Sequence, residues 1–164
     1  MADLLTHGAA AVLVKAATRW RMAPVFVAGS LAPDMMSRAP AIAMGWVHRE
    51  LTPVHPMLTY GWDPLHQPVG MLILAYLLSM LFAEALRRTV FLNLIGGMLL
   101  HLGLDLLQDH QGVGYLLAYP FSDWLFELGW VGSEDSVYVA PVFAALALWV
   151  WRVRKRGADQ NGIS

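Results

Sequence analysis

One apolar stretch in the second half of the chain carries two ionisable residues on the same face of a predicted helix. The stretch is LNLIGGMLLHLGLDLL, at residues 92–107, and its ionisable residues are His101 and Asp105. Residues four apart lie one turn apart on one side of a helix. An unpaired charge in an apolar interior costs several kcal/mol, so such groups are expected to be paired, protonated or bound to a metal ion. The fold must therefore bring a polar partner to this face of the helix.

The composition of the chain is that of an integral membrane protein. Of its 164 residues, 57% are hydrophobic and only 14% are charged, whereas about 25% of the residues in soluble domains are charged. The net charge of −1 gives no indication of a nucleic-acid partner. The chain has no cysteine, so a metal site would have to be built from histidine and carboxylate side chains.

Apolar segments predict an all-α, membrane-embedded helical bundle with about five transmembrane helices. A span needs roughly 20 residues, and three segments approach this length with few charges. Two shorter N-terminal segments contain polar groups and are predicted as tilted spans, with half-buried helices as the alternative. The strong spans are predicted at 68–86, 90–108 and 137–152, and the weaker ones at 4–18 and 22–36. Residues 1–152 form a single domain in this prediction, and residues 153–164 form a polar cytoplasmic tail.

The positions of the basic residues predict an orientation, because lysine and arginine concentrate on the cytoplasmic side of membrane proteins. Basic residues occur at 19–21, 87–88 and 152–156. All three groups are cytoplasmic if five spans alternate across the membrane. The N-terminus is then predicted to lie outside and the C-terminus inside.

This topology brings five ionisable residues to the outer side of the membrane. Neutral imidazole and carboxylate groups are both good ligands for zinc-like ions, and two neighbouring ions can activate a water molecule and hold a phosphoryl oxygen. Taken singly, each residue has an ordinary explanation as a hydrogen-bonded core histidine, a helix-end aspartate or a loop residue. Taken together, they predict a divalent metal site. The residues are His7, Asp34, His66, His101 and Asp105.

Other polar residues near the predicted site have candidate roles. Asp63 lies three residues before His66, where it could be a ligand or a hydrogen-bond acceptor for an imidazole. Asp34 or Asp63 could act as a general base. Arg38 and Arg49 lie in the loop predicted at 37–67 and could bind an anionic head group. The alternative is that they are ordinary solvated charges. Three further histidines have no assigned role: His48, His55 and His110.

Several of these residues lie in motifs that resemble a known family. The motifs are Thr6-His7, GSLAPDM at 29–35, His66 before the third helix, and HLGLDLLQDHQGVGYLLAYPFS at 101–122. They resemble small bacterial inner-membrane proteins described as metal-dependent hydrolases. The order His, Asp, His and His-x-x-x-Asp is also similar to part of the zinc-dependent phospholipase C and single-strand nuclease superfamily.

The resemblance implies a location, a metal centre and a reaction. The five residues would bind one or two divalent ions, with zinc the first choice and manganese or iron as alternatives. A metal-activated water would then cleave a phosphoester of a membrane lipid or lipid-linked substrate. The site would lie near the periplasmic face of the bacterial inner membrane.

Two other functions stay open at this point. Histidine and aspartate within a membrane also mark ion pathways, so the chain could be a non-enzymatic metal or proton carrier. Lys15, Glu84 and Asn93 would then continue the pathway towards the inner side. Alternatively, the histidine and aspartate side chains could simply tie the helices together in a structural membrane partner.

Overall fold

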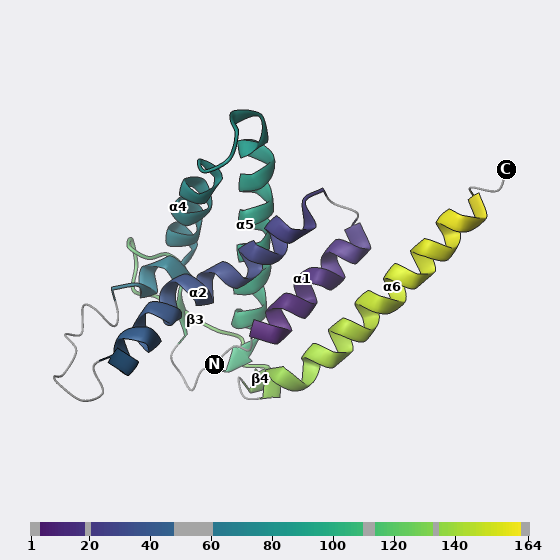
Figure 1. Cartoon of the computed structure of the whole chain (residues 1–164). Coiled ribbons are helices and arrows are strands. Elements are labelled where there is room, and N and C mark those ends of the chain that lie inside the picture. The colour runs from purple at the N-terminus through teal and green to yellow at the C-terminus, as the bar shows by residue number, and fades with distance from the viewer. Residues whose placement is uncertain (1–3, 19–20, 48–60, 110–113, 133–134, 162–164) are drawn as a thin grey trace.

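In the part of the chain that the computed structural model describes, the fold is all-α apart from four two-residue strands (Figure 1). The structure describes residues 4–18, 21–47, 61–109, 114–132 and 135–161. The predicted fold class is confirmed at this level. The helices are α1 (Leu4–Thr18), α2 (Ala23–Val47), η1 (Asp63–His66), α4 (Pro68–Ser79), α5 (Glu84–Leu106), η2 (Asp135–Val139) and α6 (Ala140–Asn161). The strands are β1 (Gln108–Asp109), β2 (Tyr115–Leu116), β3 (Leu125–Phe126) and β4 (Val131–Gly132).

Two of the described helical segments are long and apolar enough to cross a membrane, judged by length and composition. They are α5 and the segment Asp135–Arg156, which contains η2 and most of α6. Helices α1 and α4 are also apolar, but they have only 15 and 12 residues, short of the roughly 20 that a span needs. The predicted five-span bundle is therefore not confirmed, and the orientation deduced from the basic residues stays a prediction.

The predicted span at 68–86 is wrong at its C-terminal end. Helix α4 ends at Ser79 and α5 begins at Glu84, so Arg87 and Arg88 lie in the first turns of α5 and not in a loop. The Ser79 hydroxyl donates to the carbonyl three residues earlier (2.7 Å), which competes with helical backbone bonding. Hydropathy gives no signal for this break because the connecting residues are themselves apolar.

Two other helices extend beyond their predicted ends. Helix α2 contains Pro33 and Pro40 and still runs through Val47, although the prediction placed a loop after residue 36. Helix α6 continues to Asn161, into the segment predicted as a polar tail. Neither the prolines of α2 nor the polar residues at the end of α6 therefore ends its helix.

Helices α2 and α5 cross with their backbones in direct contact at two glycines. A Cβ atom on Gly97 would lie 2.6 Å from the amide nitrogen of Ser30, and one on Gly29 would lie 2.8 Å from the Cα atom of Leu94. Only glycine fits at such distances, and small residues are a common means of close approach between membrane helices. The two glycines therefore fix where along each helix the crossing occurs.

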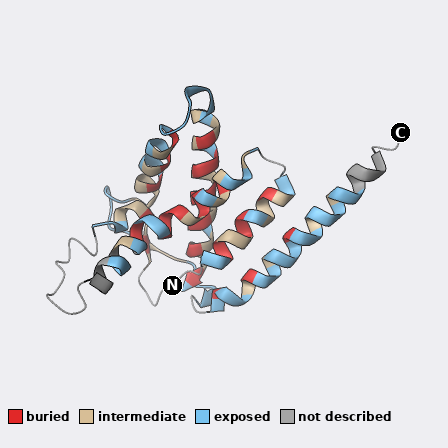
Figure 2. Cartoon of the chain, in the orientation of Figure 1, coloured by how far each residue is buried: buried red, intermediate tan, exposed pale blue. Residues whose placement is uncertain are grey.

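The hydrophobic core lies between α4, α5 and the middle of α2. Met71 and Ala75 of α4 belong to the same buried cluster as Val90, Leu94 and Met98 of α5. Figure 2 shows buried residues along most of the length of α5. This helix is therefore the central element on which the other helices pack.

Helix α1 packs beside α6, and the rest of α6 extends away from the bundle (Figure 1). Thr6 donates to the carbonyl of Ser136 (2.8 Å) at one end of α1. At the other end, the Arg154 guanidinium donates to the carbonyl of Ala17. Most of the α6 surface is exposed, including large apolar side chains such as Trp149 (Figure 2). These contacts hold α1 to η2 at one end and to α6 at the other.

The segment after α5 forms two small pairs of strands that cover that end of the helix. Strand β1 pairs with β4 in parallel, and β2 pairs with β3 antiparallel, with Tyr115 opposite Phe126. Tyr115 is buried and joins the hydrophobic core. The β2–β3 pair thus brings a residue from outside the helices to the end of α5.

We expect Gly97→Ala to destabilise the protein, because the added methyl group would overlap the backbone of α2. Gly103→Ala is the matched control, since a Cβ atom there, on the same helix, meets nothing within 4 Å. Thermal unfolding in detergent should show a loss of about 1–3 kcal/mol for Gly97→Ala. Gly103→Ala should gain up to about 1 kcal/mol from helix propensity. Equal melting temperatures for the two variants would contradict the close crossing.

Candidate metal centre

Five side chains from four helical elements meet inside the bundle, and none is more than 5% exposed. One comes from α1, one from α2, one from η1 and two from α5. The structure thus brings together all five residues that the sequence predicted as metal ligands. We refer to them as the His/Asp cluster: His7, Asp34, His66, His101 and Asp105.

Ser30 of α2 joins the helices that carry most of the cluster. Its hydroxyl donates to the carbonyl of His7 on α1 (3.2 Å), and its carbonyl oxygen lies 2.7 Å from Nδ1 of His101 on α5. Pro33 lies inside the same helix, and an internal proline disrupts the backbone ladder of the preceding turn. The Ser30 carbonyl lies in the turn before this proline and accepts from the His101 side chain.

The contact with Ser30 fixes the position of the proton on His101. A carbonyl oxygen can only accept, so Nδ1 of His101 donates, and in the neutral ring Nε2 then carries a lone pair. This Nε2 lies 2.8 Å from Nε2 of His66 and 3.2 Å from Oδ2 of Asp105. A backbone carbonyl on one ring nitrogen, with the other nitrogen facing the site, is the usual arrangement of a metal-binding histidine.

Four donor atoms of the cluster have the mutual spacing expected of ligands to one ion. Nε2 of His66 lies 3.4 Å from Oδ1 of Asp34 and 3.4 Å from Oδ2 of Asp105. Nε2 of His101 lies 4.0 Å from Oδ1 of Asp34. Nitrogen and oxygen ligands of a tetrahedral zinc ion, each about 2.1 Å from the metal, are about 3.4 Å apart. The observed distances lie around this value. The ligand atoms form two groups that could each hold a metal ion, one of Asp34, His66 and His101 and one of His7, His101 and Asp105.

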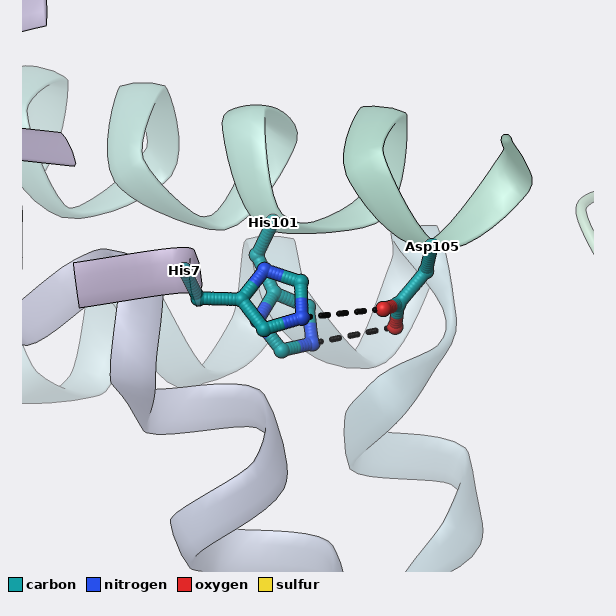
Figure 3. Close-up of side chains that lie close together, drawn as sticks. All are labelled: His7, His101 and Asp105. Atoms are coloured by element: carbon teal, nitrogen blue, oxygen red, sulfur yellow. Dashed lines mark ion pairs between the residues drawn. The ribbon is translucent and has the colours of Figure 1, made fainter. Parts of the chain in front are cut away.

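His7 adds a fifth donor on the other oxygen of Asp105 (Figure 3). Its Nε2 lies 3.0 Å from Oδ1 of Asp105, and its ring stacks on that of His101 with centroids 4.0 Å apart. The two atoms are close but not aligned as a hydrogen bond, and neither has a hydrogen-bond partner among the described residues. Buried donor atoms in this state fit metal ligands, and the two oxygens of Asp105 face different imidazoles, with Oδ1 towards His7 and Oδ2 towards His66 and His101.

The negative charge of Asp105 is not balanced by any lysine or arginine among the described residues. Its contacts there are three imidazoles and the hydroxyl of Tyr115. A buried carboxylate requires a proton on a neighbour or a bound cation. Because the neutral form of His101 presents a lone pair to Asp105, a divalent cation suits this set of nitrogen and oxygen donors.

The structure does not bring every predicted site residue to the cluster. Asp63 begins η1 but is exposed. It belongs to neither of the two groups of His and Asp side chains that lie close enough together to hold a metal ion. The side chain of Arg38 and the whole of Arg49 lie outside the described part of the chain. Their substrate-binding roles stay predictions. The three histidines without an assigned role also lie outside the described residues: His48, His55 and His110.

Tyr115 is a residue of the site that the sequence analysis missed. It is 7% exposed, and its hydroxyl donates to Oδ2 of Asp105 (2.9 Å). Its ring stacks against that of His66, with centroids 5.4 Å apart. It therefore orients a carboxylate and an imidazole at once. Tyr115 lies in β2 and Asp105 in α5, so helical periodicity could not predict their contact. The only signal in the sequence was the position of this tyrosine inside the 101–122 motif.

We expect Tyr115→Phe to weaken metal binding by about tenfold to a hundredfold, the usual effect of removing a hydrogen bond to a ligand. The ring and its stacking on His66 are retained, so the fold should survive. Zinc titration of the purified protein with a competing chelator measures the affinity. Tyr138→Phe, at a tyrosine 75% exposed, is the control and should bind like the wild type. An unchanged affinity in Tyr115→Phe would remove this residue from the site.

The chain matches one known family over nearly its whole length. The model of the YdjM inner membrane protein family covers residues 3–162, a range that includes the complete His/Asp cluster. No curated protein and no solved structure matches the chain. The match agrees with the membrane location predicted from composition and with the predicted resemblance to bacterial inner-membrane proteins. The likeness to hydrolases and to phospholipase C stays a prediction. The chain belongs to the YdjM inner membrane protein family.

Proposed function

We propose that this chain is a membrane-embedded, metal-dependent hydrolase that cleaves a phosphoester of a lipid or lipid-linked substrate. The observation that carries the proposal is the His/Asp cluster, in which five buried donors from α1, α2, η1 and α5 converge. Burying two carboxylates and three imidazoles is costly unless a cation or protons balance them. Mixed imidazole and carboxylate donors favour zinc, with manganese or iron as alternatives.

Each member of the cluster has a role in this proposal. His66, His101, Asp34 and Oδ2 of Asp105 would hold one ion, and His7 with Oδ1 of Asp105 offers a position for a second. A bound ion would polarise a phosphoryl oxygen and lower the pKa of a water molecule. Ser30 holds His101 in the tautomer that presents Nε2 to the cluster.

Asp34 is the favoured general base. Its Oδ1 lies 3.4 Å from Nε2 of His66 and 4.0 Å from Nε2 of His101, so this carboxylate would lie beside a water molecule activated at the cluster. Asp63 is a second candidate on the basis of the sequence alone, because the structure does not place it among the groups of the cluster. Arg38 and Arg49 remain candidates for binding the anionic group of the substrate.

The burial of the cluster supports a lipid substrate. Three of its five ligands, His7, His101 and Asp105, lie in the apolar helices α1 and α5 of a chain of an inner-membrane family, a position that a water-soluble substrate would not require. The distribution of basic residues supports a site near the periplasmic face. The reacting bond would then lie close to the head groups of the outer leaflet.

Metal content is the first test of the proposal. We expect the detergent-purified protein to hold about one or two equivalents of zinc, manganese or iron by elemental analysis, and His101→Ala and Asp105→Asn to lose most of it. Asp109→Asn, an exposed carboxylate four residues beyond Asp105, is the matched control and should keep its metal. If the wild-type protein held no metal after reconstitution with each of these ions, the proposal of a metal centre would be wrong.

Turnover is the second test, because a metal centre alone does not make an enzyme. We expect the metal-loaded protein to release phosphate or a phosphorylated head group from lipid phosphoesters in mixed micelles. Asp105→Asn should reduce the rate by about a hundredfold or more, because removing a mere hydrogen-bond partner of a ligand already costs about tenfold to a hundredfold. Metal or proton flux into liposomes without turnover would establish the carrier instead. Loss of thermal stability on chelation, with neither flux nor turnover, would establish a structural role.

A further inference from the structure

A groove lies between α1, α2 and α6, away from the His/Asp cluster. It encloses about 610 Å³, within the range of sites that bind small molecules. Its walls are almost wholly apolar and consist largely of alanines, with Val12, Leu148 and Trp151 among the larger residues. The small side chains leave a space between helices that are otherwise packed together. The groove therefore suits a hydrocarbon chain.

One end of this groove is surrounded by positive charge. Lys15 lines the groove and is buried, and its ammonium group donates to Oδ1 of Asn93 (2.6 Å) and to the carbonyl of Arg21 (3.3 Å). Arg154 donates to the carbonyl of Ala17, and the Lys155 ammonium lies 5.6 Å from the ring of Trp151, which lines the groove. Cationic side chains of α1 and α6 therefore lie at this end, and the backbone of Arg21 contacts Lys15 there.

The stretches that carry these cations have no acidic residue of their own. Residues 4–33 and 140–157 contain neither aspartate nor glutamate. A positive charge in or near a bilayer is stabilised by an anionic lipid head group. An apolar groove that ends at a cluster of cations thus matches a molecule with a hydrocarbon chain and a negatively charged head.

We propose that this groove binds one acyl chain of an anionic phospholipid, with the lipid phosphate against Arg21, Arg154 and Lys155. A second copy of the chain fits less well, because a symmetric contact would bring the same cations opposite one another. Lys15 lies eight residues after His7, about 12 Å along the helix. The lipid site is therefore separate from the His/Asp cluster and does not depend on whether that cluster is catalytic.

The proposal is tested by comparing two lipids that have the same acyl chains but an anionic or a zwitterionic head group. Dioleoylphosphatidylglycerol or dioleoylphosphatidylcholine is titrated into the full-length protein in a neutral detergent. Bound lipid is counted by native mass spectrometry, and the melting temperature is followed in parallel. We expect one tightly bound phosphatidylglycerol and at least a fivefold weaker association of phosphatidylcholine. Equal binding of both lipids would overturn the head-group assignment.

Two variants test the two halves of the proposed site. Ala144→Leu fills the groove at an exposed position and should weaken phosphatidylglycerol binding at least fivefold. The double variant Arg21→Gln/Lys155→Gln alters only exposed side chains, so it should fold, and it should remove the preference for phosphatidylglycerol. Arg88→Gln, an exposed arginine of α5 outside the groove, should bind like the wild type. Unchanged affinity in the double variant, or a change of oligomeric state in Ala144→Leu without loss of lipid, would overturn the proposal.

Discussion

The direct backbone contact between α2 and α5 is the constraint on which the rest of the structure depends. Gly29 and Gly97 allow the two helices to touch, and this contact places Ser30 beside the next turn of α5, where His101 lies. Asp105 follows one turn later, and Asp34 approaches from α2. A side chain larger than hydrogen at either glycine would separate the helices and move the two halves of the His/Asp cluster apart.

The cluster also depends on contacts that lie outside the crossing. Ser30 and the Thr6 contact with η2 hold α1 so that His7 stacks on His101, while the short η1 helix presents His66 just before α4 begins. Tyr115 closes the arrangement from β2. Each ligand is thus supported by a different neighbour, which keeps polar groups in a defined geometry inside an apolar bundle.

The sequence predicted more of the site than of the helix boundaries. Polar residues are rare and conspicuous in apolar segments, so the five members of the cluster could be identified and assigned to one side of the bundle. The break between Ser79 and Glu84 was not predictable from hydropathy because both sides of it are apolar. Tyr115 was missed because its contact with Asp105 depends on the folding of the β2–β3 segment, and no periodic pattern records such a contact.

The shortness of α4 has a consequence for the surrounding membrane. Its 12 residues span about 18 Å, whereas the hydrocarbon layer of a bilayer is about 30 Å thick. If a helix this short crossed the bilayer, it would create a hydrophobic mismatch, and lipids would relieve that mismatch by thinning locally. Since α4 starts immediately after His66, the thinned layer would lower the boundary between head groups and acyl chains towards the depth of the His/Asp cluster. Water and lipid phosphates could then reach that depth along the outside of the protein, without a channel through its interior.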